Sequence, residues 1–541
     1  MNKKLEKIIH SKSFLIAMIV LLIILVISAG TYAWFTWSST NNTNLTMSIG
    51  ASSDVIFKNG NDISTNKLAP VFNYTDGEST SFTIINKSTA GFGYRISLNI
   101  TSIADELKNS TLKYKLVSNN TVMAEGDFSN IESNSKNTLY EGGLFKGNVD
   151  FIFYLYIDGN EENDLNMINK SLVGTITVEE RKPALDTLNK LNKLNNTITL
   201  ANDTPDFTTV SGNNGKDSNG KTGLGDGTKG IYAAEDDFGT SYYFRGAVEN
   251  NYVKFANFYW RIIRINGDGS IRMIYAGTSA YANGDTNQVS SIGTTAYNLN
   301  YQDNGYVGYM YGNFTTPTNC NTDNNTGVTT CTGGSTSYEE AHANINDSDI
   351  KTYIDNWYNN NLKDYAYVIE DTIYCNDRSI TPVDNFLNMT LTGTGKGIEN
   401  TAYSGLTRGY INHTPSLKCA NKNDRFTVNN SIGNTKLTNP IALITSDEVI
   451  MGGLSNYDFV NNAYIENPNS YLATPNYWYW TMTPFAAAGG SASVYRVDCD
   501  ILDDGDLGDD DNYGGGRPVV SLSSDAISGG KGTMNDPFTV G

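Results

Sequence analysis

Histidine, cysteine and basic side chains are scarce in this chain of 541 residues, and each scarcity argues against a class of function. Lysine and arginine number 38 against 57 acidic residues, which gives a formal net charge of −19. Nucleic acid is not expected as a partner, because phosphate binding depends on clustered Lys and Arg. None of the five cysteines forms a CxxC pair or has a histidine at metal-ligand spacing, so we expect no zinc site.

The motifs of common hydrolases are also missing. The chain contains neither HExxH nor GxSxG, the patterns that build a zinc site or expose a nucleophilic serine. Of the three histidines, His10 lies in the basic N-terminal flank, and His342 and His413 are interpreted as structural. Residues 225–230 match GxGxxG, but no strand precedes them, so we expect no nucleotide site. We predict that the protein is not an enzyme.

A basic N-terminus precedes a long apolar run. Four lysines come before the uncharged residues 13–33: Lys3, Lys4, Lys7 and Lys12. This order predicts that residues 1–33 form a signal peptide or a membrane anchor, with the rest of the chain facing outward. Residues 31–33 fit a cleavage site and the aromatic residues 34–37 fit an interfacial anchor, so cleavage and retention both remain open. We expect an exported protein, anchored at the cell membrane and surface or secreted.

The cysteines fit an exported chain, although their pairing stays open. Cys320 and Cys331 can close a local loop, and Cys375 and Cys419 can join distant segments, which leaves Cys499 alone. Connectivity is not determined by spacing, so other pairings remain possible.

The region 34–181 alternates apolar and polar residues in short runs, each bounded by turn formers. The runs cover residues 45–49, 81–85, 94–100, 112–117, 151–157 and 172–178. This pattern predicts an all-β sandwich. The segment AGTYAWFTWSST before it resembles the TasA and camelysin class of exported Gram-positive proteins. That resemblance implies a surface or matrix-fibre protein, whereas the strands alone imply a stalk.

A linker is expected over 182–226. Leucines recur at three-residue spacing from Leu185 to Leu194 and predict a short helix, and a Gly/Asn-rich tether follows. Beyond it, residues 258–265 and 271–275 flank the turn Asn266–Ser270 and predict a hairpin. Residues 353–362 predict a helix and 441–449 a strand, so the pattern for 227–541 is α+β.

Seven segments of this region occur in a characteristic order: YYFRG, WRIIRINGDGSIRMIY, YCNDRS, ITSDEV, YWYWTMTP, GGGRPVVSL and GGKGTMNDPF. Together they resemble the C-type-lectin-fold domains of exported Firmicutes proteins, especially the variable proteins of diversity-generating retroelements. The resemblance covers residues 227–541 and implies an α+β C-type-lectin-like domain. In that family, segments matching Trp480–Pro484 and Gly516–Leu522 frame the variable, ligand-contacting residues. It therefore implies a variable region at about 485–516.

The composition between these frames agrees with the mechanism that the resemblance implies, which randomises adenines, mostly at asparagine codons. Such codons cannot become Lys, Glu, Gln, Met or Trp, and none of these occurs between Phe485 and Gly516. An ordinary acidic loop of Asp and Gly turn formers is the alternative explanation.

The resemblance assigns roles to named residues. The expected ligand-binding face is Tyr479, Phe485, Ala487, Tyr495, Arg496, Asp498, Cys499, Asp500, Asp503, Asp504, Asp506, Asp509, Asp510, Asp511, Asn512 and Tyr513. The expected scaffold is Trp478, Trp480, Pro484, Arg517 and Pro518. No cofactor is expected; calcium is the alternative, although no EF-hand spacing is present and no Glu closes the acidic loop.

The sequence therefore predicts a cell-surface receptor or adhesin with a diversified binding face. The expected partner is a protein or glycan at a cell or phage surface, with the N-terminal helix in the membrane. Two alternatives remain: a structural surface or matrix-fibre subunit of the TasA type, and a carbohydrate-binding lectin with a fixed site.

Overall fold

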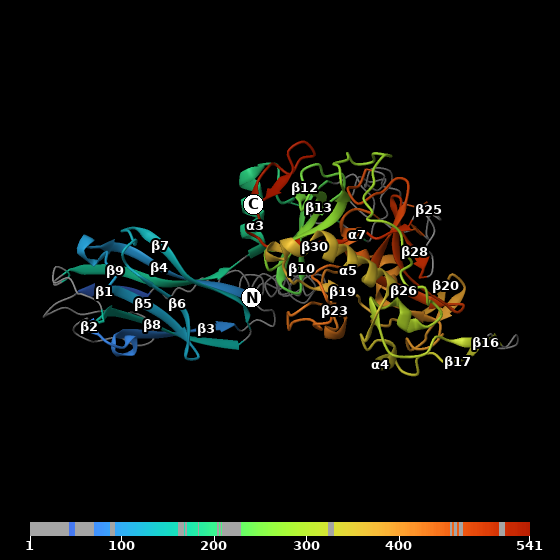
Figure 1. Ribbon diagram of the computed structural model, residues 1–541, viewed down its shortest axis with the longest axis horizontal. Coiled ribbons are helices and arrows are strands. Elements are labelled where there is room, and N and C mark those ends of the chain that lie inside the picture. The colour runs from blue at the N-terminus through green and yellow to red at the C-terminus, as the bar shows by residue number, and fades with distance from the viewer. Residues whose placement is uncertain are drawn as a thin grey trace, which may run out of the picture. The chain divides into compact units, whose positions relative to one another are not determined.

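A computed structural model shows a mostly β protein with several sheets, few helices and two disulfides (Figure 1). It describes residues 43–48, 70–86, 92–145, 147–160, 167, 170–181, 183–202, 205, 207, 229–322, 329–454, 457–458, 463–464, 469–507 and 514–541. The chain divides into two compact units, Met1–Arg181 and Lys182–Gly541. The predicted signal or anchor at 1–33 and most of the predicted tether lie outside the described residues. No helix among the residues that are described is long and apolar enough to span a membrane.

The first unit consists of two sheets. The four-stranded sheet has the order β1 (Thr43–Ser48), β9 (Ser171–Arg181), β4 (Phe92–Ile103) and β7 (Ser135–Phe145). The five-stranded sheet has the order β2 (Pro70–Val71), β8 (Gly147–Asp158), β5 (Leu112–Ser118) and β6 (Thr121–Asp127), with β3 (Glu78–Asn86) also paired to β8. All six runs expected as strands lie within or overlap β1, β3, β4, β5, β8 and β9.

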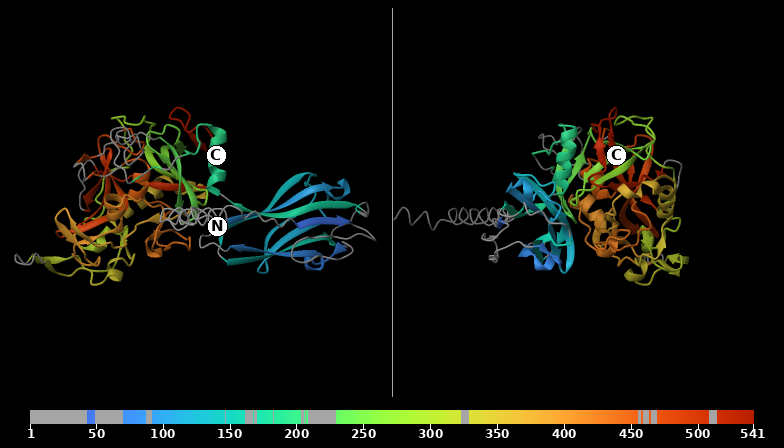
Figure 2. Two further views of the ribbon diagram at one scale, coloured as in Figure 1. Left: turned by 180° about the vertical axis from the view of Figure 1, so that it is seen from behind. Right: turned by 60° about the vertical axis from the view of Figure 1, so that its left-hand side comes forward.

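One hydrophobic core lies between these sheets. Ile96, Leu98 and Ile100 of β4 are buried at every second position, and Phe151, Phe153 and Leu155 of β8 alternate in the same way within one cluster. Alternation places every second side chain on one face of a strand, so each sheet contributes one apolar face. Figure 2 shows the strands of both sheets running along the length of this unit.

The second unit contains a larger sheet around the predicted hairpin. Its order is β10 (Gly230–Asp236), β11 (Gly239–Arg245), β13 (Phe258–Ile265), β12 (Tyr252–Phe255), β32 (Phe538–Val540) and β31 (Ile527–Gly529). β14 (Ile271–Gly277) pairs with β13 and with β30 (Val519–Leu522). The hairpin expected around residues 266–270 is confirmed as β13–β14, and the Asn266 amide donates to the Ser270 carbonyl at 2.9 Å.

A second, five-stranded sheet carries the predicted site. Its order is β22 (Thr401–Ala402), β26 (Trp478–Ala488), β27 (Ser491–Asp498) and β28 (Ile501–Asp506), and β29 (Gly514–Gly515) pairs with β26. The other strands form two-stranded ribbons: β15 (Met310–Tyr311) with β18 (Asn346–Asp347), β16 (Thr318–Thr322) with β17 (Thr329–Thr332), β19 (Tyr374–Cys375) with β23 (Arg425–Phe426), β20 (Val383–Phe386) with β21 (Met389–Leu391), and β24 (Tyr457–Asp458) with β25 (Ala463–Tyr464).

Few helices accompany these sheets. They include α3 (Pro183–Leu194), α4 (Tyr338–Ala341), α5 (Asp349–Asn361), α6 (Ser404–Leu406) and α7 (Ser446–Met451). The helix expected in the linker is α3, and it is part of the second unit. Leu188 and Leu191 are buried in the core of that unit, and the Thr187 hydroxyl donates to the Gly269 carbonyl at 2.8 Å.

The strand expected over 441–449 is wrong. Ala442 makes only an isolated bridge to Val519, and the helix α7 begins at Ser446. The cause is a capping box, in which the Thr445 side chain accepts from the Glu448 amide and the Glu448 side chain accepts from the Thr445 amide.

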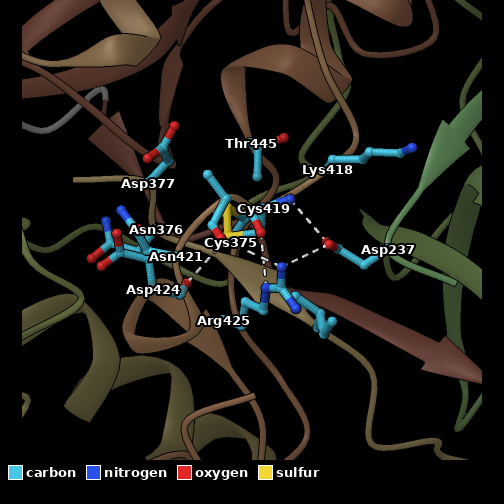
Figure 3. The surroundings of a disulfide bond; sticks show 12 residues. Asp237, Cys375, Asn376, Asp377, Lys418, Cys419, Asn421, Asp424, Arg425 and Thr445 are labelled. Carbon is cyan, nitrogen blue, oxygen red and sulfur yellow. Dashed lines mark hydrogen bonds and ion pairs between the residues drawn. A yellow bond between two sulfur atoms is a disulfide. The ribbon is translucent and has the colours of Figure 1, made fainter. Parts of the chain in front are cut away.

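The two cysteine pairs considered from the sequence are confirmed. Cys320 is bonded to Cys331, Cys375 to Cys419, and Cys499 is free. Figure 3 shows the second disulfide held by its neighbours: the Cys419 amide donates to Asp237 at 2.9 Å, and Arg425 donates to the Cys419 carbonyl at 2.8 Å. Two disulfides are typical of an extracellular or exported protein.

Candidate functional site

The C-terminal frame of the predicted face is fixed by a buried arginine. The Arg517 guanidinium is fully buried and donates to the Tyr275 carbonyl at 2.8 Å and to the Leu472 carbonyl at 2.9 Å. It also lies 4.8 Å from the ring centroid of Tyr479. The strand that follows, β30, is bonded to β14 along its length. These contacts join the end of the frame to both large sheets.

Two tryptophans fix the other frame. Trp478 packs edge-on against Trp480 with ring centroids 4.6 Å apart, and Trp480 Nε1 donates to the Thr295 carbonyl at 2.8 Å. A Cβ at Gly514 would lie 2.2 Å from the Trp478 ring, so that position requires glycine. All the residues expected as scaffold are buried: Trp478, Trp480, Pro484, Arg517 and Pro518.

Four residues that were expected to contact a ligand are buried instead, and the expectation is corrected for them: Tyr479, Phe485, Ala487 and Tyr495. The Tyr479 hydroxyl donates to the Leu472 carbonyl at 2.9 Å. The ring centroid of Tyr495 is 5.0 Å from that of Phe485 and 6.0 Å from that of Tyr410. Ala487 is also buried, in the pairing of β26 with β27. Removing a large aromatic side chain from water is favourable, so Tyr479, Phe485 and Tyr495 pack in the core below the hairpin.

The polar residues of the same hairpin reach the surface. Arg496 lies opposite Asp503 in the β27–β28 register, and its guanidinium is 4.9 Å from the Trp478 ring centroid and 3.4 Å from Asp498. We call the following set the hairpin face; its members are partly or fully exposed: Arg496, Asp498, Asp500, Asp503, Asp504 and Asp506. The remaining expected contacts, Asp509, Asp510, Asp511, Asn512 and Tyr513, lie outside the described residues.

The turn between β27 and β28 holds the unpaired cysteine. Cys499 has a left-handed backbone, with φ of 54°, and its carbonyl accepts from the Thr474 amide at 2.7 Å. Burial, followed by the charge of Asp498, raises the pKa of the Cys499 thiol to about 11. The thiol is therefore protonated at neutral pH and is a poor nucleophile.

The acidic side chains of β28 do not ionise alike. Burial, reinforced by the charge of Asp503, raises the pKa of Asp504 to about 6. Burial also raises the pKa of Asp503. The charge of the hairpin face therefore becomes more negative as pH rises through about 6.

A segment that the sequence did not indicate borders this face. The Asn298 amide donates to the Leu507 carbonyl at 3.0 Å, and the Ala492 amide donates to the Tyr301 carbonyl at 2.8 Å. Between these bonds, Leu299 is 62% exposed, and Tyr301 is 41% exposed. Both bonds are at the open end of the hairpin, next to Asp506, and the turn at Cys499 is at the other end. The segment therefore adds two exposed apolar side chains at the open end only. The segment has no motif, and its position depends on pairing across about 200 residues of sequence.

A buried ionic network links strands β10, β13 and β14 to the helix α7. Arg264 contacts Asp236 at 2.6 Å and Glu448 at 2.9 Å, and Arg272 contacts Glu448 at 2.6 Å. Arg408 joins Asp377 and Asp447 in the same region, around a cavity of about 30 Å³. Paired buried charges of this kind fix the relative position of elements. We interpret the network as structural.

Metal-binding side chains do not cluster in the described residues. No group of three or more His, Cys, Asp or Glu side chains among them could hold a metal ion. His342 is fully buried beside Tyr338, with ring centroids 4.4 Å apart, and burial lowers its pKa well below the ordinary value.

No family model matches this chain, and no curated protein matches it. Among solved structures, dimeric latent PorU from Porphyromonas gingivalis matches 27% of this chain and 14% of that chain, at 10% sequence identity and a TM-score of 0.12. The matched part is a small fraction of PorU, and a similarity at this level supports no statement about fold or function.

Proposed function

We propose that the protein is an exported cell-surface ligand-binding protein. Its first unit would be a β-sandwich stalk, and its second a C-type-lectin-like head that binds a protein or glycan through the hairpin face, Leu299 and Tyr301. The observation that carries this proposal is the division of β27 into two faces: Tyr495 is buried and Arg496 next to it is partly exposed. Exposed polar residues on a fixed scaffold are the usual arrangement of a binding surface.

The chemistry of the surface favours a ligand with basic and apolar groups. Aspartates surround Arg496, while Leu299 and Tyr301 supply apolar contact area at the edge. An interface of this kind combines apolar anchors with a polar rim, and its charges mainly set specificity and association rate. Association should therefore weaken as salt increases.

Diversification by a retroelement is part of this proposal. Its support is that substitutions at the hairpin face would alter exposed side chains without changing the buried partners of Tyr495. A reverse-transcriptase gene beside the coding sequence, with a near-copy of the 477–522 segment differing only at adenines, would establish it. Absence of that near-copy would leave a fixed binding face.

The binding proposal is tested by replacing the hairpin face as a set. The variant carries four substitutions: Asp498→Asn, Asp500→Asn, Asp503→Asn and Asp506→Asn. Its thermal unfolding transition should stay unchanged. It should no longer adhere to the cells or immobilised glycans that bind the wild type. A matched control with Asn at Asp105 and Asp127 removes acidic residues from the first unit. Equal adhesion by both variants and the wild type would refute the assignment of the face.

A further inference from the structure

Away from the hairpin face, one cluster joins a buried amine, a side-chain amide and a carboxylate. The Lys351 side chain is 1% exposed, and its Nζ lies 2.7 Å from Oδ2 of Asp355, one helical turn later in α5. Asn439 Nδ2 donates to the other oxygen, Asp355 Oδ1, at 2.8 Å. Asp355 therefore contacts both the lysine amine and the asparagine amide, and Asp347 is a second carboxylate, 3.1 Å from Lys351 Nζ.

A residue bonded to the start of α5 carries an unused donor: the Tyr309 carbonyl accepts from the Ser348 hydroxyl at 2.9 Å. The Tyr309 hydroxyl is buried and has no hydrogen-bond partner among the residues that the structure describes. Burial, and then the charges of Asp355 and Asp347, raise its pKa well above the ordinary value. A buried polar group without a partner is uncommon and needs an explanation.

Both sides of the cluster are held in place. On one side, Ser348 caps α5 and accepts from the Lys351 amide at 3.3 Å. On the other, the Tyr374 hydroxyl donates to the Pro440 carbonyl at 3.1 Å, and the Ile441 amide donates to the Asn439 carbonyl at 2.8 Å. Lys351 Nζ also lies 3.4 Å from the hydroxyl of Thr438. Lys351 Nζ and Asn439 Nδ2 are therefore held on the two oxygens of one carboxylate, which restricts their motion relative to each other.

We propose that Lys351 and Asn439 become joined by an intramolecular isopeptide bond, with Asp355 as the proton carrier. Asp355 takes a proton from the Lys351 ammonium, and the neutral Nζ attacks Cγ of Asn439. The Nζ–Cγ bond forms and the Cγ–Nδ2 bond breaks. The protons that Nζ gives up pass through Asp355 to Nδ2, which leaves as ammonium and regenerates the carboxylate. No oxidant, metal or second substrate is consumed.

The bond would link α5 to the segment that enters the buried residues Ile441–Ile444. A covalent tie of this kind restricts the unfolded chain in the same way as a disulfide but resists reduction. It does not depend on what the hairpin face binds.

Peptide mapping of the full chain tests the proposal. After reduction of the disulfides and digestion with trypsin and a Glu-specific protease, the wild type should give one branched peptide containing residues 351 and 439. Its mass should be about 17 Da below the sum of its two linear parts, the mass of the lost ammonia. Cleavage after Lys351 should also be blocked.

Two variants and a control complete the test. Lys351→Arg and Asp355→Asn should each give only linear peptides. Lys113→Arg, which changes a lysine in an ion pair with Asp158 at 2.9 Å, should leave the branched peptide intact. Linear, unmodified peptides from the wild type would overturn the proposal and leave an ordinary ion pair. This result comes from the wild type alone, so poor folding of a variant does not affect it.

Discussion

The two faces of β27 differ although they belong to one strand. Tyr495 is fully buried, stacks on Tyr410 and donates to the Gly405 carbonyl at 3.2 Å. Arg496, the next residue, keeps 19% of its side chain exposed and has acidic neighbours on its own strand and on β28. Alternation along a strand separates a face that holds the fold together from a face that can change. On β28, Asp503 pairs with Arg496 and Asp504 pairs with Tyr495, so the side chains of these two aspartates leave the sheet on opposite sides.

The largest expected effect comes from truncating the buried face. Tyr495→Ala should lower the free energy of unfolding by about 4 kcal/mol, because it leaves a cavity between Tyr410 and Phe485. Tyr495→Phe should cost only about 1 kcal/mol, the value of its hydrogen bond. Urea denaturation measures both. A small loss in the alanine variant would mean that this face is not core.

The two disulfides extend the comparison of buried with exposed regions. Cys419 is buried and its disulfide closes a separation of 44 residues, whereas Cys320–Cys331 closes 11 in a ribbon whose neighbouring residues are largely exposed. Replacing Cys375 and Cys419 by serine should destabilise the chain by about 3 kcal/mol. The Cys320/Cys331 pair, replaced in the same way, should cost less. Thermal unfolding under matched conditions would show the order, and equal losses would contradict it.

A smaller effect is expected from Asp504, which is partly exposed and pairs with the buried Tyr495 in the β27–β28 register. Its pKa in the folded state is about 6, above the ordinary 3.8, so the folded protein binds more protons between these values than the unfolded chain does. Its contribution to stability is therefore present at low pH and decreases as pH rises from about 4 to about 6. With allowance for solvent screening, Asp504→Asn should remove a pH dependence of about 1 kcal/mol. Denaturation midpoints at pH 4, 5, 6 and 7 check this, and an unchanged slope would argue against it.

The smallest effect on stability is expected at the hairpin face itself. Arg496→Ala and Asp503→Asn should each change the free energy of unfolding by less than about 1 kcal/mol, because partly exposed ion pairs contribute little. The same substitutions should change adhesion by severalfold if the face binds the ligand. A large loss of stability would instead assign Arg496 to the scaffold, together with Trp478.

Local sequence patterns predicted much of the strand content. The runs of the first unit and the β13–β14 hairpin follow from period-two alternation and from a Gly/Asn/Asp turn. The same reasoning missed β7, whose sequence SKNTLYEGGLF has little alternation, and it missed α7 because the capping box of Thr445 and Glu448 was not recognised within an apolar run. Short apolar runs do not distinguish strand from helix, and here the cap decides.

Composition by itself determined that the protein is strongly acidic and predicted that it is β-rich, because these properties depend on sums over residues. Only the tertiary structure decided which residues of the 477–522 stretch are available to a ligand. It buried Tyr479, Phe485 and Tyr495, and it brought Leu299 and Tyr301 beside β27 and β28 from another part of the chain. The reason is that exposure is a property of packing between distant segments, and the residue type alone does not contain it.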